Sequence, residues 1–438
     1  MNIITFSLKN FFSAAVLVIP FLGYAQDTAF VPKTIDPERP VCIYYPGEYK
    51  GLISHPTTQN MLNRIGGGDT PCTNFVVTYS GFTPEAQAAF QRAVDIWSFS
   101  VESNQTVRIS ATFADLQDGT LGSASAGGYI TLDPAAAPGA LADVFYPRAL
   151  AEKLLDQNTN GVFGTDISAQ FNNDTTEVPW YFGLDANPPS GQFDFVSVVL
   201  HELGHGLGFA GFGRVNALNG EIRIQPGIDL PALPSIYDNY IENGDGVDLL
   251  SFPDPSSELR NELTGENLFS NSEIAVNQNG NVLPAIFAPF SFTPGSSYSH
   301  WDEDTFGPGN INSLMSPQIG PGEANHNPGP ITLGFFEDMG WSICGGSLTV
   351  DEFNLETVEV SPNPFTSSIN ITLANGFSDT YTVDIIDING RRILSQSKSA
   401  NSGTITISNL SSLTSALYFA KITNTTTGAS ITKKIIRN

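Results

Sequence analysis

The charge of the chain changes sign near residue 360, and this change constrains the fold more than any other feature. Residues 360–438 carry seven Lys or Arg and three Asp or Glu, a net charge of +4. The whole chain has a formal charge of −25, so residues 1–359 carry −29. A shift this abrupt indicates separately folded modules. We therefore predict a larger acidic domain over residues 76–345, a linker over 346–358 and a small domain over 359–438.

Residues 359–438 are predicted to form an all-β sandwich. Short runs rich in Ile, Val, Thr and Tyr alternate with turn residues, which is typical of strands in such a fold. Asn389-Gly390 lies between two of these runs and predicts a tight hairpin, because both turn positions favour a positive φ. The expected strands are Ser368–Leu373, Tyr381–Ile388, Arg391–Gln396, Thr404–Ile407, Leu417–Ile422 and Ile431–Ile436.

The N-terminus has the pattern of a secretory signal peptide. Lys9 precedes an apolar run over Phe11–Leu22, and the small residue Ala25 stands where a signal peptidase would cut before Gln26. The run is shorter than the ~20 residues that span a bilayer. We therefore predict a signal peptide over residues 1–25 and an exported mature chain without a transmembrane segment. Residues 26–75 form an N-terminal segment of no clear identity, which could be a removed pro-segment.

The composition narrows the ligands and the chemistry. Nineteen Lys or Arg against 44 Asp or Glu argue against nucleic acid as a partner, because phosphate binding depends on clustered basic side chains. The three cysteines, Cys42, Cys72 and Cys344, form no Cys-x-x-Cys pair, which argues against a cysteine-based zinc or redox site. In an oxidising compartment Cys42–Cys72 is a plausible disulfide, although any of the three pairs would fit the sequence.

The larger domain mixes predicted helices and strands, so the expected fold class is α+β. Thr83 and Pro84 begin a helix that runs to Ser98, and Pro147–Leu155 is a second helix. Val107–Phe113 and Tyr129–Leu132 are predicted strands. Residues 212–299 are rich in Pro, Asn and Gly and are expected to be loop-like.

The clearest predicted helix, Asp194–Leu207, carries His201-Glu202-Leu203-Gly204-His205. Histidines four residues apart lie on one helix face, so both imidazoles can reach one metal ion, and neutral imidazoles suit Zn²⁺. Glu202 is rotated by about 100° from His201. Its carboxylate therefore lies beside the metal, where it can accept a proton from zinc-activated water. Gly208 is expected to end the helix.

Two histidines leave the metal shell incomplete, because a catalytic zinc usually has three protein ligands and an open position. A direct extension of the motif fails, since Gly211 stands where a third histidine would be expected. The residues alone leave the third ligand open among His55, His300, His326, Glu221, Glu242 and Glu258.

Several blocks in this domain resemble leishmanolysin-type metzincin peptidases, over roughly residues 76–345. The blocks are His201-Glu202-Leu203-Gly204-His205-Gly206-Leu207-Gly208-Phe209, Ser299-His300-Trp301 and Leu314-Met315-Ser316-Pro317. The resemblance implies a metzincin-like zinc peptidase domain with a mixed sheet and an active-site helix. It also implies zinc ligands His201, His205 and His300, Glu202 as general base, and Met315 in a Met-turn beneath the metal.

The motif and the resemblance together predict a secreted zinc metalloendopeptidase, a hydrolase of protein or peptide substrates. The alternative is a non-catalytic cell-surface adhesin or binding protein with a structural or decayed zinc site. A further alternative uses a downstream glutamate in place of His300. A structural site would be closed by a fourth protein ligand, whereas an enzyme leaves that position open.

A second cation, Ca²⁺, could bind near residue 160. Asp156-Gln157-Asn158-Thr159-Asn160-Gly161 matches the first half of an EF-hand loop. Ile167 occupies position twelve, where an EF-hand has its bidentate acid. An ordinary Asn- and Gly-rich turn is therefore the alternative.

Residues 359–438 resemble the sorting domain of the type IX secretion system. The similar blocks are Val360-Ser361-Pro362-Asn363-Pro364-Phe365, Ile388-Asn389-Gly390-Arg391, Leu417-Tyr418-Phe419 and Lys433-Lys434-Ile435-Ile436. The resemblance implies the type IX machinery as a partner. It also implies export through the periplasm and across the outer membrane to the cell surface or the medium.

Overall fold

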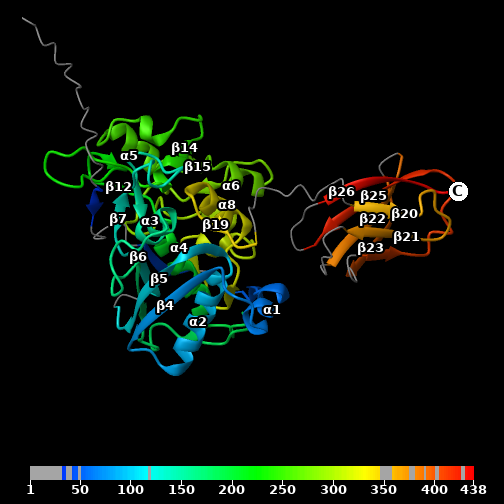
Figure 1. Cartoon of the computed structure of the whole chain (residues 1–438), viewed down its shortest axis with the longest axis horizontal. Helices are drawn as coiled ribbons and strands as arrows, with labels where there is room; N and C mark the ends of the chain where they lie inside the picture. Colours follow the sequence, from blue (N-terminus) through cyan, green and yellow to red (C-terminus); the bar gives the residue numbers. More distant parts are fainter. Residues whose placement is uncertain are drawn as a thin grey trace, which may run out of the picture.

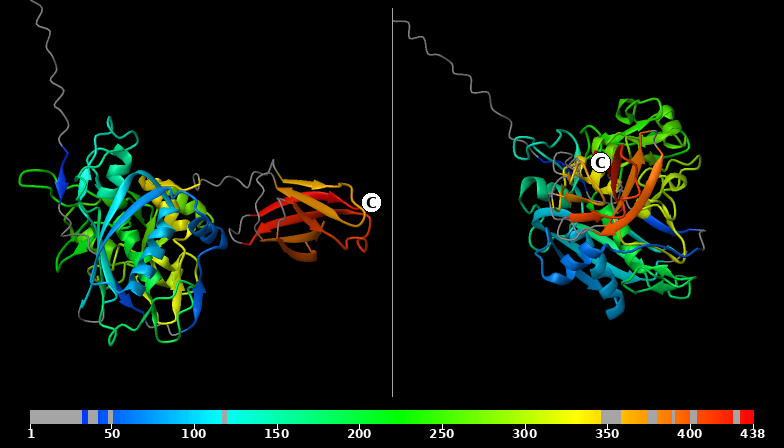
Figure 2. Two further views of the ribbon diagram at one scale, coloured as in Figure 1. Left: turned by 60° about the horizontal axis from the view of Figure 1, so that its bottom comes forward. Right: turned by 90° about the vertical axis from the view of Figure 1, so that its right-hand side faces the viewer.

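The chain folds into two bodies with separate hydrophobic cores, one upstream of residue 345 and one from residue 358 onward. Figures 1 and 2 show helices and strands in the larger domain and strands alone in the smaller one. The predicted signal peptide and residues 346–357 of the predicted linker lie outside the described residues. The computed structural model describes residues 32–35, 42–47, 51–116, 120–345, 358–373, 380–388, 391–399, 404–425 and 430–438.

A mixed seven-stranded sheet organises the larger domain, in the order β17-β2-β6-β9-β5-β19 with β4 also paired to β5. Strands β4, β5 and β9 are parallel, whereas β6 runs antiparallel to β9, and β2 runs antiparallel to β6. Strand β5 begins at Val101, six residues before the predicted start, and Tyr129–Thr131 forms β7 as expected. The seven strands are β2 (Cys42–Pro46), β4 (Thr73–Ser80), β5 (Val101–Ala114), β6 (Gly122–Ala126), β9 (Ile167–Asn172), β17 (Gln318–Ile319) and β19 (Ser342–Ile343).

Two predicted helices pack against each other beside this sheet. Helix α2 (Pro84–Ser98) is capped by Thr83, whose side chain accepts a hydrogen bond from the Ala86 amide. Helix α4 (Phe195–Leu207) is capped in the same way by Asp194, and every one of its residues is buried. Both predictions are confirmed. Burial on every face is typical of a helix surrounded by core, and α4 packs on α2, β6 and β9.

The expectation of loop over residues 212–299 is wrong in part, because the segment contains several short elements. None of them exceeds the seven residues of α5, so sequence periodicity cannot reveal them. Besides β17, the elements between residues 208 and 341 are β12 (Arg214–Val215), β13 (Gly220–Glu221), η1 (Tyr237–Tyr240), β14 (Ile241–Asn243), η2 (Leu249–Ser251), α5 (Ser257–Leu263), β15 (Leu268–Ser270), α6 (Glu273–Gln278), β16 (Ala285–Ile286), α7 (Glu303–Phe306), η3 (Ser313–Met315), β18 (Glu323–Asn325) and α8 (Pro330–Met339).

The disulfide differs from the predicted one. Cys72 pairs with Cys344, with a Cα–Cα distance of 5.7 Å, whereas Cys42 lies in β2. The bridge joins the start of β4 to the end of the domain, a proximity that depends on the pairing of β19 with β5. The remaining elements are β1 (Thr34–Ile35), β3 (Ile53–His55), α1 (Gln59–Gly67), β8 (Phe145–Pro147), α3 (Arg148–Leu155), β10 (Trp180–Tyr181) and β11 (Phe193–Asp194).

The smaller domain is the expected sandwich, with sheets in the orders β20-β21-β24 and β23-β22-β25-β26. The predicted hairpin turn Asn389-Gly390 lies outside the described residues, but the strands that flank it are paired antiparallel. Within the described part of the chain, no helix has both the length and the apolar character needed to cross a bilayer. The strands are β20 (Val358–Ser361), β21 (Ile369–Leu373), β22 (Thr380–Asp387), β23 (Arg392–Ser399), β24 (Thr404–Ile407), β25 (Leu417–Asn424) and β26 (Ser430–Ile436).

Candidate metal centre

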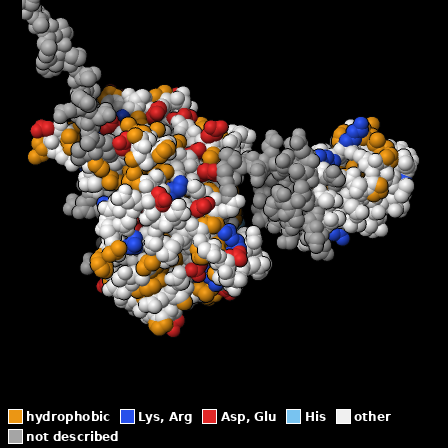
Figure 3. Space-filling model, in the orientation of Figure 1, with side chains coloured by type: hydrophobic (Ala, Val, Ile, Leu, Met, Phe, Trp, Pro, Cys, Tyr) orange, Lys and Arg blue, Asp and Glu red, His pale blue; other side chains and the backbone are white. Residues whose placement is uncertain are grey.

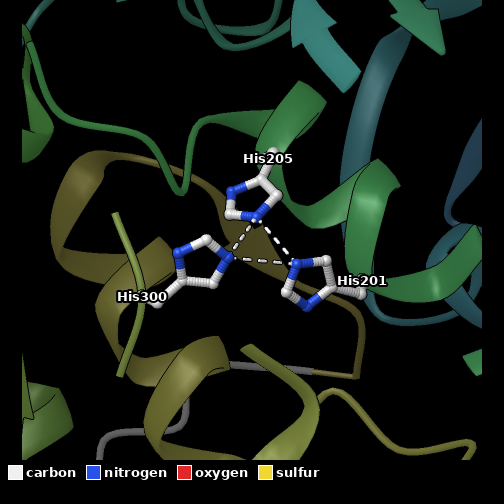
Figure 4. Close-up of side chains that lie close together, drawn as sticks. All are labelled: His201, His205 and His300. Atoms are coloured by element: carbon white, nitrogen blue, oxygen red, sulfur yellow. Dashed lines mark hydrogen bonds between the residues drawn. The ribbon is translucent and has the colours of Figure 1, made fainter. Parts of the chain in front are cut away.

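Three histidines from two distant parts of the chain meet in the core of the larger domain. His201 and His205 project from one face of α4, and His300 enters from the loop that follows β16 (Figure 4). Their Nε2 atoms are 2.9 Å apart between His201 and His205, 3.1 Å between His205 and His300, and 3.2 Å between His201 and His300. The three imidazoles therefore converge on one point.

The opposite ring nitrogens show which tautomer the histidines adopt. Each Nδ1 faces a main-chain carbonyl oxygen: Leu314 at 2.6 Å for His201, Phe209 at 2.7 Å for His205 and Ser296 at 2.5 Å for His300. Because a carbonyl can only accept, each Nδ1 carries the proton and each Nε2 presents a lone pair. Three lone pairs at this separation repel one another unless a cation lies among them. A tetrahedral zinc ion would separate such nitrogens by about 3.3 Å, so the residues fit the metal.

Burial keeps these imidazoles neutral. It lowers the pKa of His201 and of His205 well below the ordinary value, and the neighbouring histidines add to the effect. Burial also lowers the pKa of His300 to about 4. Neutral imidazole is the form that ligates a metal.

Glu202 is buried beside the cluster on the same helix. Burial raises the pKa of its carboxyl well above the ordinary value. Neither carboxylate oxygen makes a hydrogen bond of ordinary geometry with the described residues, although the main chain at Ala124 and Tyr44 lies close enough to offset part of the shift. Burying a carboxylate without well-formed hydrogen bonds costs free energy, and a carboxyl group with a strongly shifted pKa is a candidate functional group.

The glycines of α4 allow its neighbours to approach closely. A Cβ on Gly204 would lie 2.7 Å from Met315 Sδ, and a Cβ on Gly206 would lie 2.3 Å from Ile167 Cγ2. Gly208 ends the helix at a φ of 128°, as expected. Met315 is buried against α4 in η3, and its carbonyl accepts a hydrogen bond from the Trp301 amide, next to His300. The segment around Met315 thus packs against the helix that carries His201 and His205 and bonds to the main chain next to His300.

The other candidate ligands lie elsewhere. His326 is buried with its Nε2 2.8 Å from Asp194 Oδ1, and it anchors the start of α4 rather than the metal. Glu221 pairs with Arg214, and Glu242 accepts a hydrogen bond from Asn271. Among the described residues, neither His55 nor Glu258 joins the three histidines.

The side chains of the predicted calcium loop bind separate partners. The Asp156 carboxylate accepts a hydrogen bond from Gln105 Nε2, and Asn158 Oδ1 accepts one from the Gly161 amide. Asn160 donates to Asp166. Calcium binding by this loop stays a prediction.

Sequence reasoning missed Tyr44, which lies in β2. Its ring stacks on His201 with centroids 3.6 Å apart and an interplanar angle of 1°. No spacing relates residue 44 to residue 201, so only the pairing of β2 with β6 reveals the contact.

Two families match parts of the chain. Residues 359–438 match the family described as secretion system C-terminal sorting domain, and residues 136–226 match one described as SPBPB7E8-like. The sorting domain confirms the resemblance seen in the C-terminal sequence. The chain is exported by type IX secretion to the cell surface or the medium, and the secretion machinery is its partner. No curated protein matches the chain.

Three solved structures are similar to small parts of the chain. PorZ, a surface component of the type IX secretion system of Porphyromonas gingivalis, is 20% identical with a TM-score of 0.17, over 21% of this chain and 13% of PorZ. A DUF3244 family protein with an immunoglobulin-like β-sandwich fold from Bacteroides vulgatus is 19% identical with a TM-score of 0.16. The match covers 19% of this chain and 84% of that protein. Dimeric latent PorU from P. gingivalis is 21% identical with a TM-score of 0.16. The match covers 18% of this chain and 9% of PorU.

Proposed function

We propose that the larger domain is a metzincin-like zinc endopeptidase that hydrolyses protein or peptide substrates outside the cell. The observation that carries this proposal is the convergence of three Nε2 lone pairs beside a buried glutamate. The leishmanolysin-like sequence blocks support the same activity.

His201, His205 and His300 would hold the ion, each oriented by its Nδ1–H bond to a main-chain carbonyl. Such carbonyl partners fix the ring and strengthen the nitrogen as a ligand. Zinc, when bound, polarises a carbonyl group and makes water more acidic.

Glu202 would act as the general base. It follows His201 directly in α4, and its carboxylate has no hydrogen-bond partner of ordinary geometry that would have to be displaced before it takes a proton. The proton would then pass to the leaving amine, which otherwise departs as an unstable anion.

A non-catalytic adhesin or binding protein with a structural zinc site is the alternative, and the complete burial of the three imidazoles favours it. Two observations count against it. No fourth His, Cys, Asp or Glu joins the cluster among the described residues, and a structural site has no use for Glu202.

The test is Glu202→Gln in the exported chain, with Glu258→Gln at an exposed position of α5 as the matched control. Loss of the general base should lower the hydrolysis of casein by about 10²–10⁴-fold. The zinc content should stay the same, and the control should retain full activity. A Glu202→Gln protein that hydrolyses casein at the original rate would refute the role of Glu202.

A further inference from the structure

We infer that Asp238 is a positioning residue for His300, the third zinc ligand, and that it acts through Tyr298. The Asp238 carboxylate joins the chain that leaves α4 to the chain that enters His300. The inference rests on the proposed function, because it concerns the same zinc site. It adds a residue to that site which lies outside the motif and touches neither the metal nor the substrate.

His300 needs support that the other two ligands do not. His201 and His205 are fixed by α4, whereas His300 comes 95 residues after His205, on a loop. A metal ligand has to be held to within about 0.5 Å by the residues around it. The Ser296 carbonyl orients the His300 ring, but Ser296 belongs to the same loop and cannot place that loop against α4. The contacts that do so from the N-terminal side of His300 involve Tyr298 and Ser299.

These contacts are made at Gly211, the position where a direct extension of the motif would carry a third histidine. The Gly211 amide donates a hydrogen bond to Ser299 Oγ at 3.1 Å. A Cβ on Gly211 would lie 2.3 Å from Tyr298 Cε1, and a Cβ on Gly213 would lie 2.3 Å from Tyr298 Cδ1. Because these two positions carry no side chain, the residues that precede His300 can approach the end of α4.

Asp238 closes this contact from the other side. Its Oδ1 accepts hydrogen bonds from the Tyr298 hydroxyl at 2.9 Å and from the Phe212 amide at 3.1 Å, so a single oxygen bonds to both chains. Its Oδ2 accepts from the amide and the hydroxyl of Ser235, at 2.7 and 2.8 Å, which fixes the carboxylate. Asp238 and Tyr298 are fully buried. Hydrogen bonds to an ionised carboxylate are stronger than bonds between neutral groups.

The main chain of Tyr298 shows that this support is needed. Its φ is 75°, in the left-handed region that bulky side chains rarely adopt. Such a conformation persists only where the surroundings hold it. Asp238 holds the Tyr298 hydroxyl, and the Tyr237 hydroxyl donates to the Tyr298 carbonyl at 2.7 Å. Loss of the bond to Asp238 should let this backbone relax and displace His300, two residues further along the chain.

The experiment compares Asp238→Asn and Tyr298→Phe in the full chain with the control Thr73→Val. The control also deletes a buried hydrogen bond, from Thr73 Oγ1 to the Val101 carbonyl in β5. Competition with a chelator measures the affinity for Zn²⁺. The visible absorption of bound Co²⁺ reports the geometry of its ligands, which a loss of stability alone does not change. Urea unfolding of the metal-free proteins measures stability separately.

Both variants should weaken zinc binding by about 10-fold, the lower end of the effect of residues that orient a ligand. Both should also change the Co²⁺ spectrum, and the control should change neither. Native zinc affinity and a native Co²⁺ spectrum in the two variants would overturn the inference. An equal loss of affinity in Thr73→Val would also overturn it, because general destabilisation would then explain the loss.

The same proteins separate this inference from the proposed peptidase when casein hydrolysis is measured as well. Weaker zinc binding in the two variants of a chain that hydrolyses no casein would uphold the role of Asp238 and refute the peptidase. Casein hydrolysis by the native chain, with zinc affinity unchanged in both variants, would do the reverse.

Discussion

The two domains of this chain differ in what they bury. Ionisable side chains lie throughout the core of the larger domain, whereas the described residues of the sandwich bury no charged side chain and no Ser, Thr, Asn or Gln. The charged side chains of the sandwich that are visible in Figure 3 are Lys and Arg. The buried ionisable residues of the larger domain are Glu152, Asp166, Asp194, His201, Glu202, His205, Asp238, His300, Glu323 and His326.

The difference bears on how each domain responds to substitution. Burying an ionisable group costs free energy unless it is paired, so a chain retains such groups where they position or perform chemistry. Substitutions at buried ionisable residues should therefore have large effects, and substitutions at charged residues of the sandwich should have small ones.

The largest expected effect is on metal binding by His300→Ala. Loss of a ligand should weaken zinc binding by more than about 100-fold, since even residues that only support a ligand contribute 10–100-fold. His326→Ala is the matched control, because this histidine is equally buried but pairs with Asp194. It should lower stability and leave one zinc per chain. Zinc content and competition with a chelator measure zinc binding by the two variants. Equal zinc loss in both would contradict the assignment of His300 as a ligand.

A second effect concerns the stability of the larger domain against pH. Burial raises the pKa of Asp238 to about 6, although Ser235, Tyr298 and the Phe212 amide donate hydrogen bonds to it. The folded state therefore holds this proton more tightly than the unfolded state, where the pKa is near 3.8. The free energy of unfolding should fall by about 2 kcal/mol as the pH rises from 4 to 7.

Asp238→Asn should remove this part of the pH dependence, whether or not the substitution itself changes the stability of the domain. Glu303 and Glu323, whose pKa values burial raises to about 7, give a slope of the same sign that the variant keeps. Urea unfolding followed by tryptophan fluorescence reports on the larger domain alone, because all four tryptophans precede residue 345. An unchanged slope would mean that Asp238 stays ionised when buried.

A smaller effect is expected at the glycines of α4. Gly206→Ala forces a Cβ against Ile167, whose branched side chain is fully buried, and should destabilise the domain by about 1–3 kcal/mol. Gly66→Ala in exposed α1 meets no neighbour within 4 Å and should be neutral or slightly stabilising. The same urea experiment compares the two variants, and equal stabilities would show that α4 tolerates a greater distance from Ile167.

The smallest effect is expected on the sandwich. Arg392 lies 3.8 Å from Asp384 with its side chain 66% exposed. Arg392→Ala should change stability by less than about 0.5 kcal/mol. Hydrogen exchange of peptides that cover β22 in the full chain measures this change. A large loss of protection would contradict the view that the surface charges of the sandwich do not hold it together.

The sequence by itself determined the local structure of both domains. Helices α2 and α4 begin where Thr83 and Asp194 cap them, because a cap satisfies amides within one turn. The spacing of His201, Glu202 and His205 follows from the helical repeat alone. The strands of the sandwich follow from alternation over a few residues. Each of these features depends on neighbours in the chain.

Only the tertiary structure decided which distant residues meet. The residues left the third histidine open among several candidates, the resemblance pointed to His300, and packing of its loop beneath α4 brought the ring to the others. Packing also paired Cys72 with Cys344 and placed Tyr44 on His201. Distance along the chain carries no information about such contacts, because they form when whole elements associate and are stabilised by the surface that those elements bury together.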